Sequence, residues 1–219
     1  MVTKKTLSEA DALEQFRVSL ENVENQPEIA LAMAEIGYDA TVIAEGNTLL
    51  TETRQSFDLN KTEDDETSEA YAEFDMLKGS LEDTYSKHRK KAKIIFRNDI
   101  ETKDKLVILE SLPKAYTNWL EVVRKFYSVA LNDAEIQDKL LRLNISLDEL
   151  TTANSLIADL EAARAEYLRE KGESQNATKA KDEAFAKMDN WMSDFYAVAK
   201  IALEDKPQLL ESLGKFVRS

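Results

Sequence analysis

The segment at residues 13–29, LEQFRVSLENVENQPEI, has a counterpart at residues 120–136, LEVVRKFYSVALNDAEI. Both segments open on Leu-Glu, carry Arg at the fifth position and end on Glu-Ile. The same offset of about 107 residues relates Ala-Lys-Ile at 92–94 to Ala-Lys-Ile at 199–201. One pattern repeated at a fixed distance indicates an internal duplication. We therefore expect two copies of one helical unit, at residues 9–112 and 115–217, fused into a single domain over residues 1–219.

Each copy contains apolar residues at spacings of three and four, which is the period of an amphipathic helix. The pattern predicts a first helix at 9–23 and 115–131, one long helix at 40–62 and 147–170, and another at 67–98 and 175–204. The polar stretches at 58–66 and 171–174 are predicted to be the turns between the long helices. Two such hairpins favour an all-α fold, an elongated antiparallel four-helix bundle with short helices at the ends.

Capping signals mark the expected ends of the shorter helices. Asn25 and Asn132 are predicted N-caps, because an Asn side chain can accept a hydrogen bond from a free amide of the first turn. Gly37 and Asn144 are expected to end helices, since Gly and Asn adopt left-handed backbone most readily. Ser146 then opens a capping box with a glutamate three residues later.

A small residue recurs at one position of the first long helix in each copy. Gly46 in copy one matches Ala153 in copy two. Small side chains on a helix face allow a neighbouring helix to come close. The pair therefore predicts a close helix contact at this level of each copy.

Composition excludes several classes of protein. The 219 residues include no Cys and one His, and their net charge is −13. Thiolate metal sites and disulfides are excluded. The acidic balance makes nucleic acid an improbable partner, and no apolar run reaches the roughly 18–20 residues of a membrane span. The first residues contain no apolar stretch typical of a signal peptide, so the expected location is cytoplasmic.

The single histidine also argues against a metal or cofactor in the bundle. A di-metal carboxylate site needs Glu-x-x-His pairs on facing helices, whereas Tyr85 precedes His88 by three residues. We expect His88 to be a packed, hydrogen-bonded side chain, and the alternative is a pH-sensitive or ligand-binding imidazole. The acidic run at 63–66 lacks the ligand spacing of an EF-hand and is read as a solvated loop. No cofactor, metal or catalytic residue is predicted.

One dense basic run interrupts the acidic chain. It contributes a possible anion-binding or partner-binding face, here called the basic face, made of Lys87, Arg89, Lys90, Lys91 and Lys93. The counterpart at 194–200 is mostly uncharged, so the two copies differ here. The alternative is a solvated helix face paired with the protein's own carboxylates.

A second candidate surface is apolar. Trp191, Phe195, Tyr196 and Val198 cover more than one stripe of their helix. A wide apolar face is typical either of a central helix or of a helix that contacts another subunit. We name these four residues the association face.

The C-terminal sequence WMSDF at 191–195, followed by AKIALEDKPQLLE at 199–211, resembles a signature of a bacterial family of uncharacterised duplicated all-helical proteins. Ile36-Gly37-Tyr38 and Glu45-Gly46 are similar to positions of the same family. The resemblance covers nearly the whole chain. It implies the duplicated helical architecture and a bacterial source, and it brings no activity or site residue with it.

These observations favour a non-enzymatic protein that acts through protein–protein association, as a scaffold, an adaptor or a self-assembling unit. The expected partner is another protein or a second copy of the chain. The alternative is a small-molecule carrier that binds its ligand between the two pseudo-symmetric halves, since bundles often hold ligands between helices.

Overall fold

The computed structural model describes residues 7–214, and within that range the fold is all-α, without strands. The elements are listed here in chain order: α1 Glu9–Asn25, α2 Pro27–Glu35, α3 Ala40–Ile95, α4 Ile100–Lys105, α5 Tyr116–Asn132, α6 Ala134–Leu141, α7 Leu147–Ala202 and the 3₁₀ helix η1 Pro207–Leu213. The all-α class predicted from the helical periodicity is confirmed.

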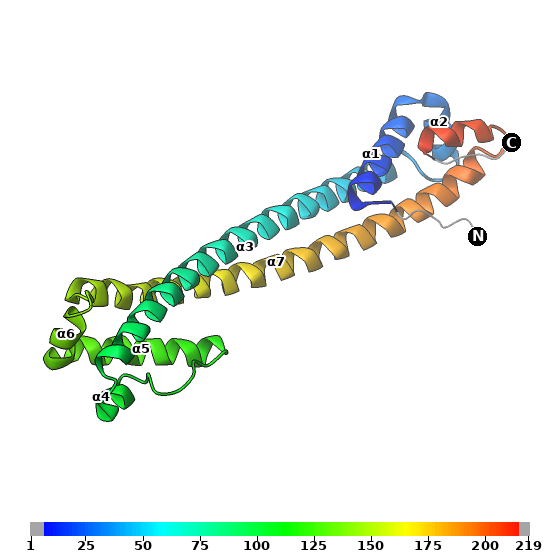
Figure 1. Ribbon diagram of the computed structural model, residues 1–219. Coiled ribbons are helices and arrows are strands. Elements are labelled where there is room, and N and C mark those ends of the chain that lie inside the picture. The colour runs from blue at the N-terminus through cyan, green and yellow to red at the C-terminus, as the bar shows by residue number, and fades with distance from the viewer. Residues whose placement is uncertain (1–6, 215–219) are drawn as a thin grey trace. The chain divides into compact units, whose positions relative to one another are not determined.

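The chain divides into two compact units. Unit 1 contains the described residues up to Asp64 and from Gly172 onward, and unit 2 contains Asp65–Lys171. Unit 1 therefore holds α1, α2, η1, the first part of α3 and the last part of α7. Unit 2 holds α4, α5, α6, the last part of α3 and the first part of α7, as the colours of Figure 1 show.

The helix bounds repeat at the offset of the sequence identities. Adding 107 to the bounds of α1 gives those of α5, and adding it to the bounds of α3 gives those of α7. The same shift carries the first residue of α2 to that of α6, and the first residue of α4 to that of η1. Each unit thus contains helices at matching positions along the sequence, with segments taken from both halves of the chain.

The predicted turns at 58–66 and 171–174 are wrong, because α3 and α7 each continue through them as helices of 56 residues. The first stretch contains neither Gly nor Pro, and its polar residues cost little in a helix. Contacts with α7 hold it in place within unit 1. Asn60 donates to Thr178 Oγ1 at 3.1 Å, and Ser174 Oγ donates to Asp64 Oδ1 at 2.6 Å.

The antiparallel four-helix bundle depended on those turns. Since both turns are helical, the four predicted long helices are two, and each supplies a segment to both units. Within unit 1 the segments of α3 and α7 run antiparallel, because the α3 contacts advance from Thr53 to Asp64 while their α7 partners go back from Ala184 to Ser174.

Capping is partly as expected. Ser146 and Glu149 form the predicted capping box, with the Ser146 amide donating to Glu149 Oε2 at 2.9 Å and the Glu149 amide donating to Ser146 Oγ at 3.2 Å. Gly37 and Asn144 have φ angles of 93° and 54°, as predicted for left-handed ends. Both N-cap predictions are wrong: Asp133, one residue after Asn132, caps α6 through its carboxylate, and Gln26, one residue after Asn25, precedes α2 without a side-chain capping hydrogen bond.

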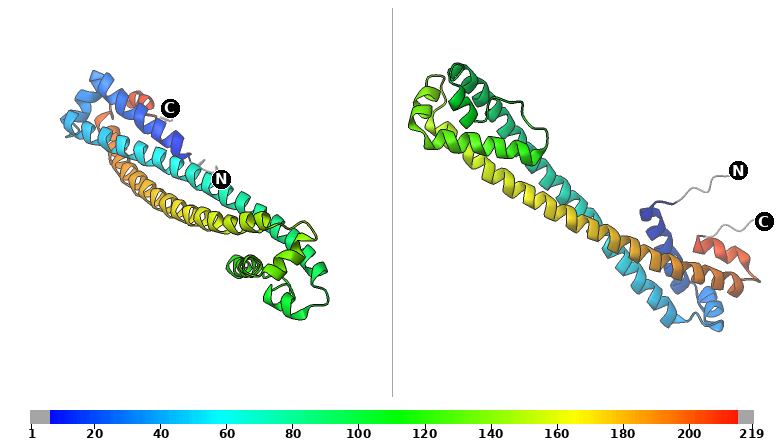
Figure 2. Two further views of the ribbon diagram at one scale, coloured as in Figure 1. Left: turned by 90° about the vertical axis from the view of Figure 1, so that its left-hand side faces the viewer. Right: turned by 90° about the horizontal axis from the view of Figure 1, so that it is seen from below.

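Unit 1 has its own core between α1, α2, α3, α7 and η1. Gly46 lies directly against Trp191, as the close-approach prediction requires. The short η1 packs on α1, where Ser19 Oγ donates to the Leu213 carbonyl at 3.0 Å and Asn22 donates to the Ser212 carbonyl at 2.6 Å. Both views of Figure 2 show η1, in red, beside α1.

Unit 2 has an equivalent core. Its fully buried members come from α3, α5, α6, α7 and the segments between the helices, and they include Leu81, Phe96, Phe126, Leu140 and Leu160. This core presents the C-terminal part of α3 with one buried side and one solvent side. The basic face lies on this part of α3.

Candidate functional site

The basic face occupies the last turns of α3 in unit 2. Lys87, Lys90 and Lys93 are exposed, whereas Arg89 and Lys91 are half-buried. Arg89 donates to the carbonyls of Ile108 and Glu110, and Lys91 Nζ donates to the Asn144 carbonyl at 3.2 Å. The face is thus divided, since two of its cations hold loop carbonyls of unit 2 and the other three point to solvent.

Carboxylates do not neutralise this face in the described part of the chain. None of its five cations lies within 4.0 Å of an Asp or Glu oxygen, although lysines nearby are paired, such as Lys78 with Glu82 at 2.9 Å and Lys105 with Glu101 at 2.8 Å. Burial lowers the pKa of Lys93, and the charges of Arg89 and Lys103 lower it further. The expected alternative, a face paired with the protein's own carboxylates, is therefore not the arrangement found.

An exposed isoleucine lies among these cations. The Ile94 side chain is 63% exposed, and its equivalent in unit 1, Ile201, is 65% exposed. Lys87 precedes Ile94 by seven residues, which places the two side chains on one face of the helix. Sequence reasoning named the cations and missed the isoleucine, since periodicity alone did not separate it from the buried stripe.

His88 lies on the opposite, buried side of the same turn, with 5% of its surface exposed. Its Nδ1 is 3.1 Å from Tyr127 Oη. Burial lowers the pKa of His88, the charge of Glu149 raises it, and Lys91 and Lys87 lower it. The imidazole is a packed, hydrogen-bonded side chain, which is the expected reading.

The association face does not form a surface. Phe195 is fully buried and Tyr196 is 8% exposed, with its hydroxyl 2.8 Å from Ser19 Oγ. Trp191 stacks on Phe195 with ring centroids 5.5 Å apart, and Val198 is half-buried. These four residues belong to the unit 1 core, because α7 is a central helix of that unit.

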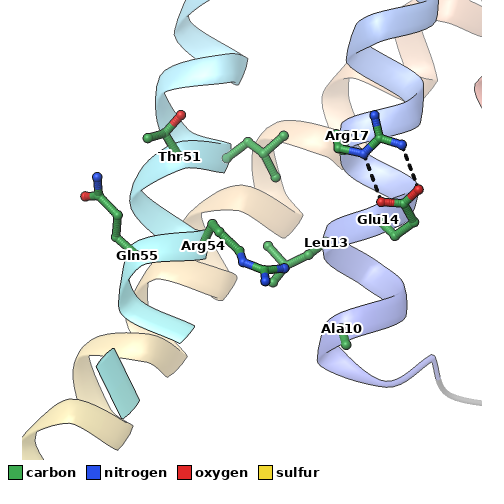
Figure 3. A pocket seen from close by; sticks show the side chains of 8 residues that line it. Ala10, Leu13, Glu14, Arg17, Thr51, Arg54 and Gln55 are labelled. Carbon is green, nitrogen blue, oxygen red and sulfur yellow. Dashed lines mark hydrogen bonds and ion pairs between the residues drawn. The ribbon is translucent and has the colours of Figure 1, made fainter. Parts of the chain in front are cut away.

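Unit 1 contains a groove that sequence reasoning did not identify. It lies between α1 and α3, has a volume of about 520 Å³ and is lined by apolar and polar side chains: Ala10, Leu13, Glu14, Arg17, Leu50, Thr51, Arg54 and Gln55. Figure 3 shows Arg54 reaching from α3 toward Leu13 on α1. The two arginines of the groove are 37 positions apart in the sequence, so no local motif contains both.

The two arginines of the groove differ in how fully they are paired. Arg17 donates through Nε and Nη2 to Glu14 at 2.9 and 2.7 Å, and through Nη1 to Glu21. Arg54 donates through Nε to Asp58 Oδ2 at 3.0 Å. Among the described residues, nothing accepts from the terminal Nη1 and Nη2 of Arg54.

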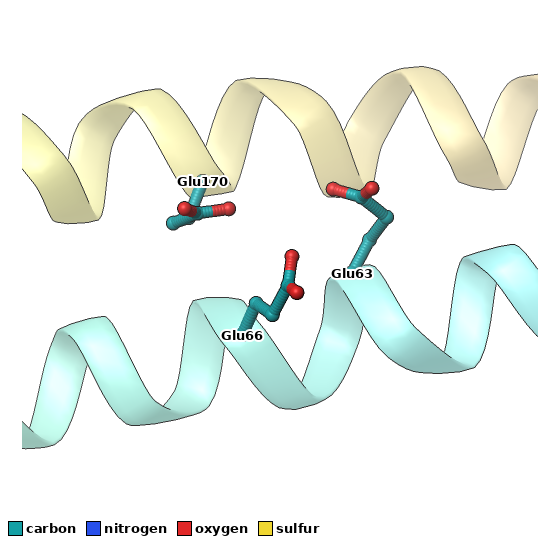
Figure 4. Close-up of side chains that lie close together, drawn as sticks. All are labelled: Glu63, Glu66 and Glu170. Carbon is teal, nitrogen blue, oxygen red and sulfur yellow. The ribbon is translucent and has the colours of Figure 1, made fainter.

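Two carboxylates of unit 2 face each other from α3 and α7, Glu66 and Glu170, both labelled in Figure 4. Within unit 2, the carboxylates of Glu66 and Glu170 have oxygens within 4.8 Å of each other. Glu170 is buried and paired with Arg169. The solvated loop expected at 63–66 is wrong, because these residues are helical. An acidic cluster whose buried member has an arginine partner is not by itself a metal site.

No helix among the described residues is long and apolar enough to cross a membrane. Comparison of the chain with protein-family models, curated proteins and solved structures finds no match. The resemblance to a bacterial family of duplicated helical proteins accordingly stays a prediction.

Proposed function

We propose that this chain is a non-enzymatic protein that acts by associating head to tail with further copies of itself, as a self-assembling scaffold unit. One observation carries the proposal. The two equivalent exposed isoleucines, Ile94 and Ile201, are flanked by charges of opposite sign. Lys87 and Arg97 flank the first, and Asp194 and Glu204 flank the second at the same spacings.

We call Lys87, Ile94 and Arg97 the basic strip, and Asp194, Ile201 and Glu204 the acidic strip. All six side chains are exposed. Among the described residues none of the four charged members forms an ion pair within 4.0 Å. Residues seven apart share a helix face, and Arg97 and Glu204 lie in the turns just after α3 and α7.

Antiparallel contact of the two strips would place isoleucine against isoleucine, with Lys87 toward Glu204 and Arg97 toward Asp194. Each charged pair is offset by four residues, about 6 Å along the helix axis, which the long Lys and Arg side chains can span. Burial of one isoleucine is worth about 1.5–3 kcal/mol, whereas an exposed ion pair is worth about 0–1 kcal/mol. The isoleucines therefore supply most of the affinity. The charges supply orientation, speed of association and salt dependence.

The contact joins two different surfaces, unit 2 of one copy and unit 1 of the next. Such a heterologous contact leaves one strip free at each end of a dimer, so further copies can add. Like charges on the acidic chain oppose close approach at low salt. We therefore expect a weak, concentration-dependent series of oligomers and no closed pair.

The repeated helix bounds and the matching division into units support a further part of the proposal. We infer that the chain arose by tandem duplication of one helical unit, followed by divergence of charge at the end of each long helix. On this account divergence turned two equal surfaces into two complementary ones. Membership of the resembled bacterial family and a cytoplasmic location are proposed with it.

Charge exchange tests the association. The variant K87E/R97E has two acidic strips, and D194K/E204R has two basic strips. By sedimentation velocity at about 0.1 M salt, where the Debye length is about 10 Å, we expect each variant alone to be monomeric and an equimolar mixture to associate like the original chain. A mixture that stays monomeric, or an original chain that is monomeric at every concentration, would overturn the proposal.

A further inference from the structure

The groove between α1 and α3 differs from the equivalent place in unit 2 in the sign of the charge at one position of the long helix. Arg17 of unit 1 corresponds to Arg124, and Arg54 corresponds to Glu161. In unit 2, Arg124 on α5 forms an ion pair with Glu161 on α7, which ties the two helices together. In unit 1 the same two positions are both arginines, so no such tie can form.

Without that ion pair, the groove of unit 1 has an apolar lining and a guanidinium whose terminal N–H groups have no acceptor among the residues that the structure describes. Leu13 is 3% exposed and Leu50 is half-buried, and they give the groove an apolar lining. The guanidinium of Arg54 reaches toward Leu13 (Figure 3), and its Cζ is 5.7 Å from the centroid of the Phe57 ring. An apolar lining with unpaired guanidinium donors fits a molecule with an apolar chain and one anionic head.

We propose that this groove binds a single-chain amphiphile with a carboxylate head. The terminal Nη1 and Nη2 of Arg54 would donate to the carboxylate as a bidentate pair, which is the geometry for which Arg is best suited. The chain of the amphiphile would lie along Leu13 and Leu50. The volume of about 520 Å³ lies within the range of small-molecule sites.

A carboxylate suits this site better than a dianion because neighbouring Asp and Glu side chains offset most of the positive charge of the two arginines in the groove. Glu14 and Glu21 occupy Arg17, and Asp58 takes the Nε of Arg54. The remaining donors match one planar monoanion, whereas a dianionic phosphate would meet the nearby Glu14 and Asp58 carboxylates. This site lies within unit 1 and does not depend on association of the chain.

The test is calorimetric titration of the full chain with dodecanoate, dodecyl phosphate and dodecanol. We expect dodecanoate to bind at one site per chain and dodecanol to bind about tenfold or more weakly, since a hydrogen bond to a charged group is worth a factor of that order. If dodecanol bound as tightly as dodecanoate, the groove would bind apolar chains without recognising the carboxylate, and the proposal would be overturned. Tighter binding of dodecyl phosphate would overturn the choice of head group.

The decisive variant is R54E/D58A, which gives unit 1 the residues of unit 2, where Glu161 and Ala165 stand. The carboxylate introduced at position 54 would pair with Arg17 and close the groove, so the fold should keep its thermal stability while dodecanoate affinity falls about tenfold or more. The matched control is R164E, an exchange at an arginine outside the groove, which should bind as the original chain does. Unchanged binding by R54E/D58A would overturn the proposal.

Discussion

Gly46 on α3 faces the indole of Trp191 on α7 so closely that a methyl group at Gly46 would lie 2.6 Å from Cζ2 and nearer still to Cη2. In unit 2 the equivalent positions are Ala153 and Thr84. The smaller Thr84 side chain leaves room for the Ala153 methyl group, and the larger Trp191 requires a glycine. The side-chain volumes at the two pairs of positions therefore compensate, Gly with Trp in unit 1 and Ala with Thr in unit 2.

Substitution of Gly46 by alanine is predicted to destabilise the protein by about 1–3 kcal/mol, the usual cost of overpacking. The matched controls are G79A and G172A, since a Cβ at either position meets nothing within 4 Å. These should stabilise by up to about 1 kcal/mol, because alanine favours the helix. Urea unfolding of the three variants checks the signs. A gain in stability for G46A would contradict the close contact.

A second prediction concerns pH. The pKa of His88 is lowered by burial in the folded chain, so the unfolded chain binds the proton more tightly. Stability should be complete above 6.5, the ordinary pKa of a histidine, and should fall as pH decreases from 6.5 through the lower folded pKa. The free energy of unfolding, measured against pH for the original chain and H88Q, should show this slope in the original chain alone. Equal slopes would contradict the assignment.

The pairs that lower carboxyl pKa values act in a more acidic range. Arg17 lowers the pKa of Glu14 and Arg169 lowers that of Glu166, in each case from the ordinary glutamate value of 4.5. Their stabilisation is present above that value and is lost as pH falls below it. The difference in slope between the original chain and H88Q from pH 5 to 6.5 therefore isolates His88, with Glu149 as the neighbouring acid that opposes the effect of burial.

A third prediction tests the continuity of α3. Lys61 is exposed and helical, in the stretch where the polar sequence predicts a turn. A proline at Lys61 should cost about 3 kcal/mol or more, because proline removes a helix hydrogen bond and clashes with the preceding turn. The K61A control should cost little, since its contact is the exposed cation over Phe57 at 4.5 Å. Thermal unfolding that is equal for K61P and K61A would indicate a turn.

Local sequence signals were sufficient to predict where several helices begin or end. The Ser146 and Glu149 capping box and the left-handed Gly37 and Asn144 involve residues within one turn, so their chemistry can be read directly. The cap of α6 was misplaced by one residue because Asn132 and Asp133 are both good caps, and the choice depends on where α5 ends.

Features that depend on distant residues could not be read in the same way. The stretch around Asn60 looks like a turn in isolation, and its hydrogen bond with Thr178 connects positions 118 apart. The burial of Phe195 depends on how α7 packs in unit 1. The groove depends on Arg17 and Arg54, and its only sequence signal is the comparison with Arg124 and Glu161 in the second copy.

The most direct test of the proposed association is zero-length carbodiimide cross-linking of an equal mixture of ¹⁴N-labelled and ¹⁵N-labelled chains. Cross-linked peptides of mixed isotope content come from two copies, whereas uniform ones include contacts within one copy. We predict mixed peptides in which Lys87 is joined to Glu204, and their loss in I94S, which removes the apolar contact and keeps both cross-linking groups. Mixed peptides that exclude both strips, or no mixed peptides at all, would contradict head-to-tail association.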